Sequence, residues 1–369
     1  MSNSNIKAGK PEASLLRSDI ENILQCPSCK SPKLITDLAV GEITCGSCRA
    51  IYPINSEGGW CSFLPQESDT EVKANIKAWW DDLYQQLYAE NDAVLSAEDY
   101  LQQLDHLEDF FKKTDHLAVN EMPINELAGK RVLEIGSGSG ANSALFKKHG
   151  ADIVSVDITP GRVISTALKF RLVPGGPGRA YQADAERLPF RDESFDVVYS
   201  NGVLHHSEDT GQCISEVLRI LKPGGLAVLM LYSRYSANFY LNILPRGLGT
   251  GYFFKHPMAE WVGLVTEGTP KHGSVKNPIT RVYSEKGIRN LLSDFEIINM
   301  RKAGYEFDQM AIPKLTQTRR SVMKALGFPL HQGGIPVAGI PRMPPTKIER
   351  YLSRYIGFNW DIQARKPHA

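Results

Sequence analysis

Hydrophobic residues between positions 130 and 231 follow two alternating patterns. Continuous apolar runs, typical of strands buried on both faces of a sheet, occur at 131–135, 152–156, 180–183, 195–200 and 226–231. Between them, apolar residues spaced three and four apart predict helices over 141–149, 162–170 and 211–221. Strands that alternate with helices in this way predict an α/β fold with an open, doubly wound and mostly parallel sheet.

The chain on either side of this core has a different pattern. Residues 71–120 show helical spacing, and Trp80, Tyr84 and Tyr88 share one helical face. That face either packs on the core as an apolar stripe or covers a ligand as a lid. Residues 232–283 and 309–350 predict long irregular connections, with a helix at 284–292 and strands at 295–300 and 360–364.

Both long connections should emerge at the edge of the sheet where ligands bind, because strands five and six of this topology end there. Long connections in compact domains are often functional. We therefore expect insertions on the substrate-binding edge that either roof an acceptor pocket or form an oligomer interface. The candidate pocket lining is aromatic and comes from the first insertion: Tyr235, Phe239, Tyr240, Tyr252, Phe253, Phe254 and Trp261.

Two cysteine pairs lie near the N-terminus, in a segment spanning 22–66. It follows a polar stretch, 1–21, that we expect to be flexible. The pairs have the spacing C-x2-C-x15-C-x2-C, which predicts a tetrahedral zinc site. Four thiolates would close the site, so the zinc would be structural and would supply folding energy to a small module. The expected ligands are Cys26, Cys29, Cys45 and Cys48, whereas Cys61 and Cys213 are expected to be ordinary core or surface residues.

Charge and composition narrow the picture. The 369 residues carry a formal net charge of +1, which excludes a global field for nucleic acid or acidic lipid. The total hides an acidic stretch at 67–126 and a basic one from 301 onward. The N-terminus has no apolar signal segment, and no apolar run is long enough to be a transmembrane segment, so we expect a cytoplasmic protein.

A glycine loop follows the first predicted strand of the core. Gly136, Gly138 and Ala141 fit the G-x-G-x-x-G/A pattern, in which backbone N–H groups at a helix start approach a ligand closely. Dinucleotide sites share this loop and a carboxylate such as Asp157 after the second strand. Two further carboxylates distinguish this site from a dinucleotide site. Asp184 after the third strand is placed to accept from an exocyclic adenine amine. The negative charge of Glu134 before the loop disfavours a pyrophosphate and favours a cationic ligand that carries an ammonium and a sulfonium.

Five segments carry a family resemblance: VLEIGSGSG, VDIT, ADAERLPF, FDVVYSNGVLHH and LKPGGLAVL. In order and spacing they resemble the motifs of class I S-adenosylmethionine-dependent methyltransferases, which have a Rossmann-like fold, and most of all the ubiquinone-biosynthesis-like subgroup. The resemblance covers 130–231 well, and 276–302 and 357–367 more loosely. It makes 67–369 one methyltransferase domain, with a helical lid at 71–120 and its core at 130–231.

The resemblance also implies roles for individual residues. The methionine moiety of S-adenosylmethionine would be lined by Gly136, Ser137, Gly138 and Gly140, with Glu134 orienting its amino group. Asp157 would hold the ribose, while adenine would contact Ile158, Asp184 and Ala185. Asn201 would face the cofactor near the transferred methyl group.

The cysteine segment, which ends RAIYPI, resembles the Trm112-like zinc ribbons, whose free-standing members activate methyltransferases. It departs from that family at Gly58-Gly59-Trp60-Cys61.

The leading prediction is methyl transfer to a small, partly apolar acceptor. His205 and His206 follow the fourth strand and would act as base if the acceptor must lose a proton, or would only pack and shape the pocket. The ribbon and the basic C-terminal third favour the alternative of an rRNA or tRNA methyltransferase. A non-catalytic cofactor-binding scaffold and, more distantly, a nicotinamide dehydrogenase complete the alternatives.

Overall fold

The computed structural model describes residues 13–55, 60–64, 70–87, 89–92, 95–266, 276–306 and 315–368. One mixed sheet organises the molecule, in the order β1-β2-β3-β4-β7-β6-β5-β8-β9-β12-β11, with β10 beside β9. Its parallel core consists of β5 (Arg131–Ile135), β6 (Asp152–Asp157), β7 (Gly178–Gln182), β8 (Phe195–Asn201) and β9 (Leu221–Ser233). The predicted α/β sheet with a parallel, Rossmann-like core is thereby confirmed.

The order of the core strands reverses next to β5. The chain runs from β5 outward through β6 to β7 and then returns to β8 on the other side of β5. Beyond β9, strand β12 (Asn359–Arg365) pairs antiparallel with both β9 and β11 (Glu296–Ala303). The short strand β10 (Val282–Tyr283) pairs parallel with the end of β9. In such sheets ligands bind outside the carboxyl ends of the strands at the point of reversal, which here lies between β5 and β8.

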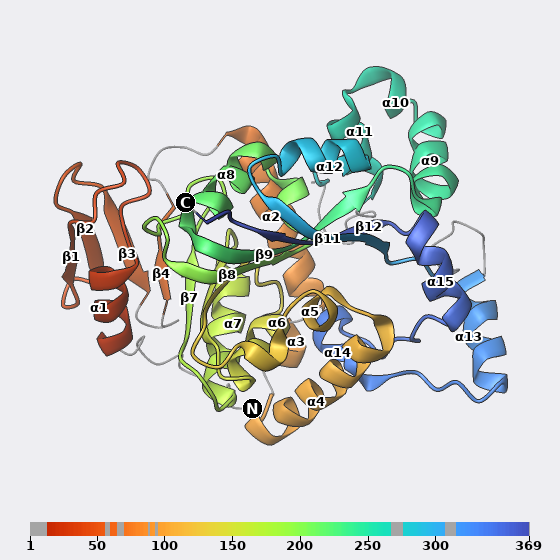
Figure 1. The fold of residues 1–369 in the computed structure, drawn as a ribbon, viewed down its shortest axis with the longest axis horizontal. Coiled ribbons are helices and arrows are strands. Elements are labelled where there is room, and N and C mark those ends of the chain that lie inside the picture. Colours follow the sequence, from red (N-terminus) through yellow and green to blue (C-terminus); the bar gives the residue numbers. More distant parts are fainter. Residues whose placement is uncertain are drawn as a thin grey trace, which may run out of the picture.

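Residues alternate between the two faces of the sheet. In β5, Val132 packs in a cluster with α4 (Ala97–Thr114), α6 (Ala141–Lys148) and α7 (Pro160–Leu172). Leu133 and Ile135 pack on the other face with α1 (Ala13–Asn22), α8 (Thr210–Ile220) and α12 (Glu285–Leu291). The sheet is thus covered on both faces, which explains the continuous apolar runs in its parallel strands (Figure 1).

The N-terminal module continues the main sheet. Strands β1 (Leu34–Asp37), β2 (Glu42–Cys45) and β3 (Ile51–Asn55) are antiparallel, and β4 (Trp60–Ser62) pairs with both β3 and β7. Figure 1 shows the module at one end of the sheet, with α1 beside it.

The prediction of a flexible N-terminal stretch is wrong from Ala13 onward, because residues Ala13–Asn22 form α1. Leu16 and Ile23 join the core, and the buried Asp19 carboxylate accepts from the Arg179 guanidinium at 2.7 and 2.8 Å and from the Tyr181 hydroxyl at 2.6 Å. The ion pair between Asp19 and Arg179 joins residues far apart in the sequence and leaves no local pattern. The polar composition of this stretch therefore wrongly predicted a flexible segment.

The insertion at 232–283 and the segment from 315 onward are helical where irregular chain was predicted. The first contains a π-helical turn (Phe239–Ile243), α9 (Leu244–Gly249), α10 (Tyr252–Lys255) and α11 (Met258–Thr266). The second contains α13 (Leu315–Ala325), α14 (Ile335–Ala338) and α15 (Lys347–Ile356). These helices are mostly short, and Pro in the first turn of α9 and α14 is compatible with a helix start.

Three further helices cover the ligand edge of the sheet or flank it. Helix α2 (Glu71–Leu87) contacts α7, followed by the short α3 (Ala89–Asp92), and α5 (Leu117–Asn120) follows α4. Among the described residues, no helix combines the length and the apolar character that crossing a bilayer requires.

Candidate active site

A cavity lies at the carboxyl ends of β5 to β8, at the point where the strand order reverses. Its empty volume is about 890 Å³ including the open mouth. Strand ends and the following loops supply one wall, and α2 supplies another. The residues used below that line it are Lys73, Ile76, Trp80, Gly136, Gly138, Asp157, Ile158, Arg162, Asp184, Ala185, Glu186, Asn201, Val203 and His206.

The glycine loop has the left-handed backbone that favours glycine. Gly136, Gly138 and Gly140 have φ angles of 78°, 56° and 77°. A Cβ on Gly136 would lie 2.2 Å from a methyl carbon of Val203, and one on Gly140 would lie 2.8 Å from the Thr166 hydroxyl oxygen. Close packing therefore requires glycine at positions 136 and 140. Gly136 and Gly138 line the cavity.

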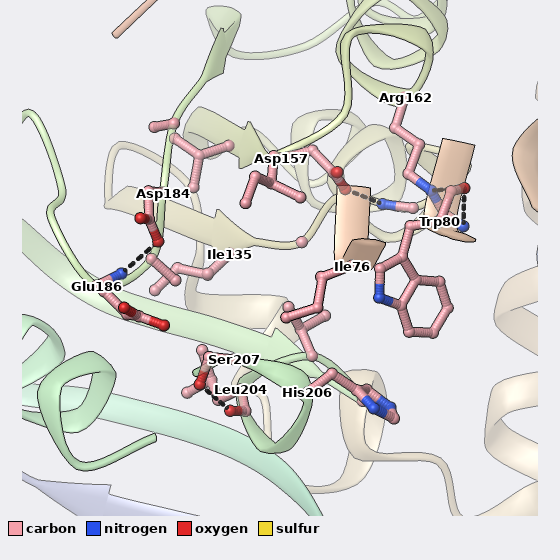
Figure 2. Close-up of a pocket in the computed structure, with 18 of the residues that line it drawn as sticks. Ile76, Trp80, Ile135, Asp157, Arg162, Asp184, Glu186, Leu204, His206 and Ser207 are labelled. Carbon is pink, nitrogen blue, oxygen red and sulfur yellow. Dashed lines mark hydrogen bonds between the residues drawn. The ribbon is translucent and has the colours of Figure 1, made fainter. Parts of the chain in front are cut away.

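Asp157, which ends β6, borders the cavity next to this loop. Its Oδ2 accepts from the backbone N–H of Gly138 at 3.3 Å, and its Oδ1 accepts from the N–H and hydroxyl of Thr159, each at 3.0 Å. Figure 2 shows Asp157 on one side of Ile135 and Asp184 on the other. The two carboxylates therefore lie on opposite sides of this part of the cavity.

Asp184 is paired with a cation from α2. Lys73 Nζ lies 2.6 Å from Asp184 Oδ2 and 3.2 Å from Glu186 Oε2, while Asp184 Oδ1 accepts from the N–H of Glu186. Burial alone would lower the pKa of the Lys73 ammonium, but its hydrogen bonds to these two carboxylates and their charges raise that pKa above its usual value. Helix α2 thus brings a permanently charged ammonium to this end of the cavity.

One face of α2 closes the cavity. Lys73, Ile76 and Trp80 line it at i, i+3 and i+7, the spacing of a single helical face. Arg162 donates from Nε and Nη2 to the Trp80 carbonyl at 3.3 Å, and its guanidinium carbon lies 5.3 Å from the centre of the Trp80 ring. Tyr84 instead points inward and donates to Asp92 at 3.1 Å. Tyr88 lies outside the described residues.

Three residues predicted to contact the cofactor, Glu134, Ser137 and Gly140, are not among the described residues that line the cavity. Glu134 is fully buried and accepts from Asn142 at 3.2 Å and from Ser143. Burial raises the pKa of its carboxyl to about 8. The Ser137 hydroxyl accepts from Thr166 at 2.9 Å, and Gly140 packs against the same residue. The lining does include the other seven: Gly136, Gly138, Asp157, Ile158, Asp184, Ala185 and Asn201.

The two histidines differ in position. His206 lines the cavity, and its ring lies 5.1 Å from that of Trp80. His205 is absent from the described lining and is fully buried between the rings of His206 and Tyr232, at 4.1 and 4.0 Å. Burial lowers the pKa of His206 to about 4 and that of His205 well below 6.5. Both rings are therefore neutral at pH 7.

A second cavity adjoins the first. Its empty volume is about 1460 Å³ including open solvent, and Asn201 lies in the walls of both cavities. Helices α4 and α5, β11, β12 and the segment 337–354 enclose it. The lining residues used below are Phe111, Thr114, Asp115, His116, Arg301, Lys302, Glu306, Arg342, Arg350, Arg354 and Asp361.

Charged pairs surround this second cavity. Arg301 pairs with Glu121 and with Asp361, the latter at 3.0 Å, and burial raises the pKa of Asp361 to about 7 despite that neighbour. Arg350 lies 3.3 Å from Asp115, and Arg342 lies 3.3 Å from Glu306.

His116 was missed by sequence reasoning. Its ring stacks on Phe111 at 3.8 Å, Nδ1 accepts from the N–H of Ala118 at 3.1 Å, and Nε2 lies 3.5 Å from the Asn201 amide. Because burial lowers its pKa to about 3, the ring is neutral, and Nδ1 is the nitrogen that accepts from the backbone. The sequence offers no signal for this pairing, since 85 residues separate the partners.

The aromatic residues expected to line the acceptor pocket lie elsewhere. Among the described lining residues, neither cavity contains any of the seven predicted positions from the first insertion. Phe239 and Trp261 form a small core of their own with ring centres 6.0 Å apart, whereas Phe254 is 75% exposed. The physical reason is that this insertion folds on itself as short helices.

The four predicted metal ligands come together. The sulfur atoms of Cys26, Cys29, Cys45 and Cys48 all lie within 4.8 Å of one another. The Sγ atoms of Cys26 and Cys48, and those of Cys29 and Cys45, are 3.6 Å apart. Tetrahedral zinc with Zn–S bonds of about 2.3 Å requires sulfurs about 3.8 Å apart, so the geometry fits zinc closely. Cys61 and Cys213 are buried, as expected of core residues.

Comparisons with known proteins identify relatives of both the parallel core and the N-terminal module. Residues 133–229 match the family model of a methyltransferase domain, and residues 19–56 match that of Trm112p-like proteins. A demethylmenaquinone methyltransferase of Clavibacter sepedonicus is 35% identical over 107 residues, which are 29% of this chain and 43% of that protein. A phthiotriol/phenolphthiotriol dimycocerosates methyltransferase of Mycobacterium ulcerans is 32% identical over 124 residues, 33% of this chain and 41% of that protein.

Among solved structures, a SAM-dependent methyltransferase of Methanosarcina mazei is similar with a TM-score of 0.45 and 21% identity, covering 67% of this chain and 97% of that one. The chain spans less than half the length of the curated relatives it matches. It contains a class I S-adenosylmethionine-dependent methyltransferase domain, preceded by a Trm112-like module with a four-cysteine cluster.

Proposed function

We propose that the protein binds S-adenosylmethionine in the first cavity and transfers its methyl group to a small, partly apolar acceptor held in the second. The observation that carries this proposal is the position of Asn201 in the walls of both cavities. Methyl transfer requires donor and acceptor in line at one boundary, and Asn201 marks such a boundary. The relatives named for demethylmenaquinone and phthiotriol dimycocerosates support a small acceptor.

The first cavity offers partners for each part of the cofactor. Among the described residues, Asp157 Oδ2 accepts one long bond of 3.3 Å, from the Gly138 backbone, which leaves it available to a ribose hydroxyl. Asp184, which is paired with Lys73, would accept from the adenine amine between Ile158 and Ala185. Gly136 and Gly138 would face the methionine part. When bound, the cofactor supplies a methyl group on a sulfonium that already carries its leaving group.

The chain itself then has to align the two reactants and exclude water. Trp80 and Ile76 cover the cofactor cavity, and the His116 ring lies 3.5 Å from the Asn201 amide on the acceptor side. His206 is neutral and would accept a proton from an acidic acceptor, while His205 would act by positioning His206. An acceptor without an exchangeable proton would need neither histidine.

We further propose that the four-cysteine cluster holds a structural zinc ion. All four ligand positions would be occupied by sulfur, so no open position would remain for chemistry. Tyr52 supports the site, since its hydroxyl lies 3.0 Å from Cys26 Sγ. The ion would stiffen the module that carries β3 and β4 to the edge of the sheet at β7.

Calorimetric titration with S-adenosylmethionine and with NAD tests the cofactor, and a methyl-labelled cofactor added to cell extract tests the acceptor. We expect binding of S-adenosylmethionine alone and label in small apolar species. Binding without any labelled product would favour a cofactor-binding scaffold, and label in polymeric RNA would overturn the proposed acceptor class.

A further inference from the structure

One face of the molecule gathers most of its exposed apolar side chains. Fourteen of the nineteen large hydrophobic residues recorded as exposed in the described chain fall within 234–255 and 315–358. Phe254, Leu326, Ile348 and Tyr355 are between 61% and 75% exposed. Apolar side chains gathered to this degree on a surface mark an interaction site.

The same two segments are strongly basic. Residues 234–255 contain Arg234, Arg246 and Lys255 and no acidic residue, and 315–358 contain seven Lys or Arg and a single carboxylate, Glu349. Glu349 is fully buried, where it accepts from Arg319 at 3.0 and 2.9 Å. In the described parts of these segments, exposed charge is therefore positive only.

The two segments meet in space. Lys302 Nζ donates to the carbonyl of Tyr235 from the first and, at 3.0 Å, to that of Tyr355 from the second. Figure 1 shows α9, α15 and α13 along one side of the molecule, at the end of the sheet opposite the cysteine module. Lys302, Arg350 and Arg354 at this side also line the second cavity. We name the exposed side chains of 234–255 and 315–358 the basic apolar face.

We infer that the basic apolar face docks on the surface of an anionic lipid bilayer. Its apolar side chains would enter the boundary between headgroups and acyl chains, and Lys324, Lys347 and Arg354 would face lipid phosphates. Exposed aliphatic residues such as Leu326 and Ile348 have no partner in RNA, and a second copy of the face would repel it by like charge. An acceptor dissolved in the bilayer would then reach the second cavity directly, an extension that rests on the proposed function.

Flotation with vesicles measures this docking. We expect the full chain to float with vesicles of phosphatidylglycerol and phosphatidylcholine and to stay behind with phosphatidylcholine alone. Each positive charge near an anionic surface is worth about a fivefold change in partitioning, so Lys324→Glu with Lys347→Glu should weaken binding more than about 25-fold. Arg17→Glu with Lys33→Glu, two exposed cations near the cysteine module, is the matched control and should change it little.

The apolar contribution has its own pair of variants. Phe254→Ser with Leu326→Ser and Ile348→Ser should lower partitioning at least about tenfold, since each side chain buries apolar area in the membrane. Ile35→Ser with Val40→Ser, comparably exposed on the cysteine module, should leave it unchanged.

Three outcomes would overturn the inference: equal binding to both vesicle types, RNA binding that only the charge variants weaken, or a concentration-dependent dimer lost with Leu326→Ser. Calorimetry with S-adenosylmethionine on the same samples separates the two proposals. Variants that still bind the cofactor are folded, so their loss of vesicle binding reports on the face itself. A wild-type chain that binds the cofactor but not the anionic vesicles would refute the docking surface and leave the proposed function intact.

Discussion

The two cavities that meet at Asn201 are assembled in opposite ways. Apart from one face of α2, the first is lined by residues between 135 and 208, each at the end of a strand or just after it. The second draws on 110–120, 301–306 and 337–361 together with Asn201 and Met230. A site built from consecutive strand ends can be recognised in a sequence, whereas a site assembled from distant segments depends on how those segments pack.

Each cavity also has a buried carboxyl group nearby, and their surroundings differ. Glu134 behind the glycine loop accepts from neutral groups, Asn142 and Ser143, whereas Asp361 at the second cavity lies 3.0 Å from Arg301. Burial raises the pKa of both, to about 8 for Glu134 and about 7 for Asp361. The first carboxyl is therefore expected to be the protonated one at neutral pH, and removing its charge tests that difference.

Glu134→Gln should have the largest effect. Because the folded pKa of about 8 lies above the ordinary 4.5, the folded state binds the extra proton, and the free energy of unfolding falls as pH rises from about 4.5 to about 8. At 1.36 kcal/mol per pKa unit this loss amounts to at most about 5 kcal/mol. Urea unfolding at pH 5 and pH 9 should show a larger loss in the wild type than in Glu134→Gln, which keeps the smaller loss due to Asp361.

The exposed substitution Glu21→Gln serves as the control and should follow the wild type at both pH values. Asp361→Asn sharpens the comparison, because it removes a titrating group but also takes a carboxylate from Arg301. We expect no gain in stability from it at pH 9. A wild type whose stability is flat between pH 5 and pH 9 would contradict the raised pKa of Glu134.

Asp157→Ala should follow, with an effect confined to the first cavity. Loss of a charged hydrogen-bond acceptor for a ribose hydroxyl costs about 2–3 kcal/mol, or roughly 30- to 150-fold in affinity for S-adenosylmethionine. Calorimetric titration measures it, with the exposed Asp105→Ala as control. Unchanged affinity would mean that the ribose lies elsewhere.

The parallel core and the cysteine cluster could be predicted because both leave local patterns. The run at 131–135 coincides with β5, and the other core strands differ from their predicted ends by a few residues. The position of Glu134 outside the cavity could also have been predicted. Neighbouring residues of a strand face opposite sides of the sheet, so Glu134 faces away from the cavity that Ile135 lines. The position of Lys73 at the cavity could have been predicted as well, because it lies seven residues before Trp80 and therefore on the same face of the helix.

The rest could not be predicted, for reasons of distance along the chain. Asp19 lies in an otherwise polar stretch and is held by Arg179, 160 residues away. Likewise, Arg301 meets Glu121 across 180 residues, and nothing in either local sequence indicates the pairing. Short helices with proline in the first turn, such as α9, have no periodicity long enough to be recognised.

Asn201→Ala tests the boundary between the cavities and should have a smaller effect than Asp157→Ala on cofactor affinity. Its side chain lies at the point of transfer, so a loss of alignment should lower kcat about 10- to 30-fold, while the affinity for S-adenosylmethionine changes less than about threefold. Single-turnover rates with saturating cofactor measure this. A variant with normal kcat and weakened cofactor binding would place Asn201 in the first cavity only.

Thr114→Trp tests the second cavity alone and should have the smallest effect. Thr114 lines that cavity from the end of α4 and does not line the first one, so a bulky indole would occupy acceptor space without touching the cofactor site. We expect KM for the acceptor to rise about tenfold, equivalent to about 1.4 kcal/mol of lost binding, with cofactor affinity unchanged. Thr114→Ser, which keeps the hydroxyl and removes one methyl group, is the matched control. An unchanged KM in the tryptophan variant would exclude the second cavity as the acceptor site and leave Asn201 facing the cofactor alone.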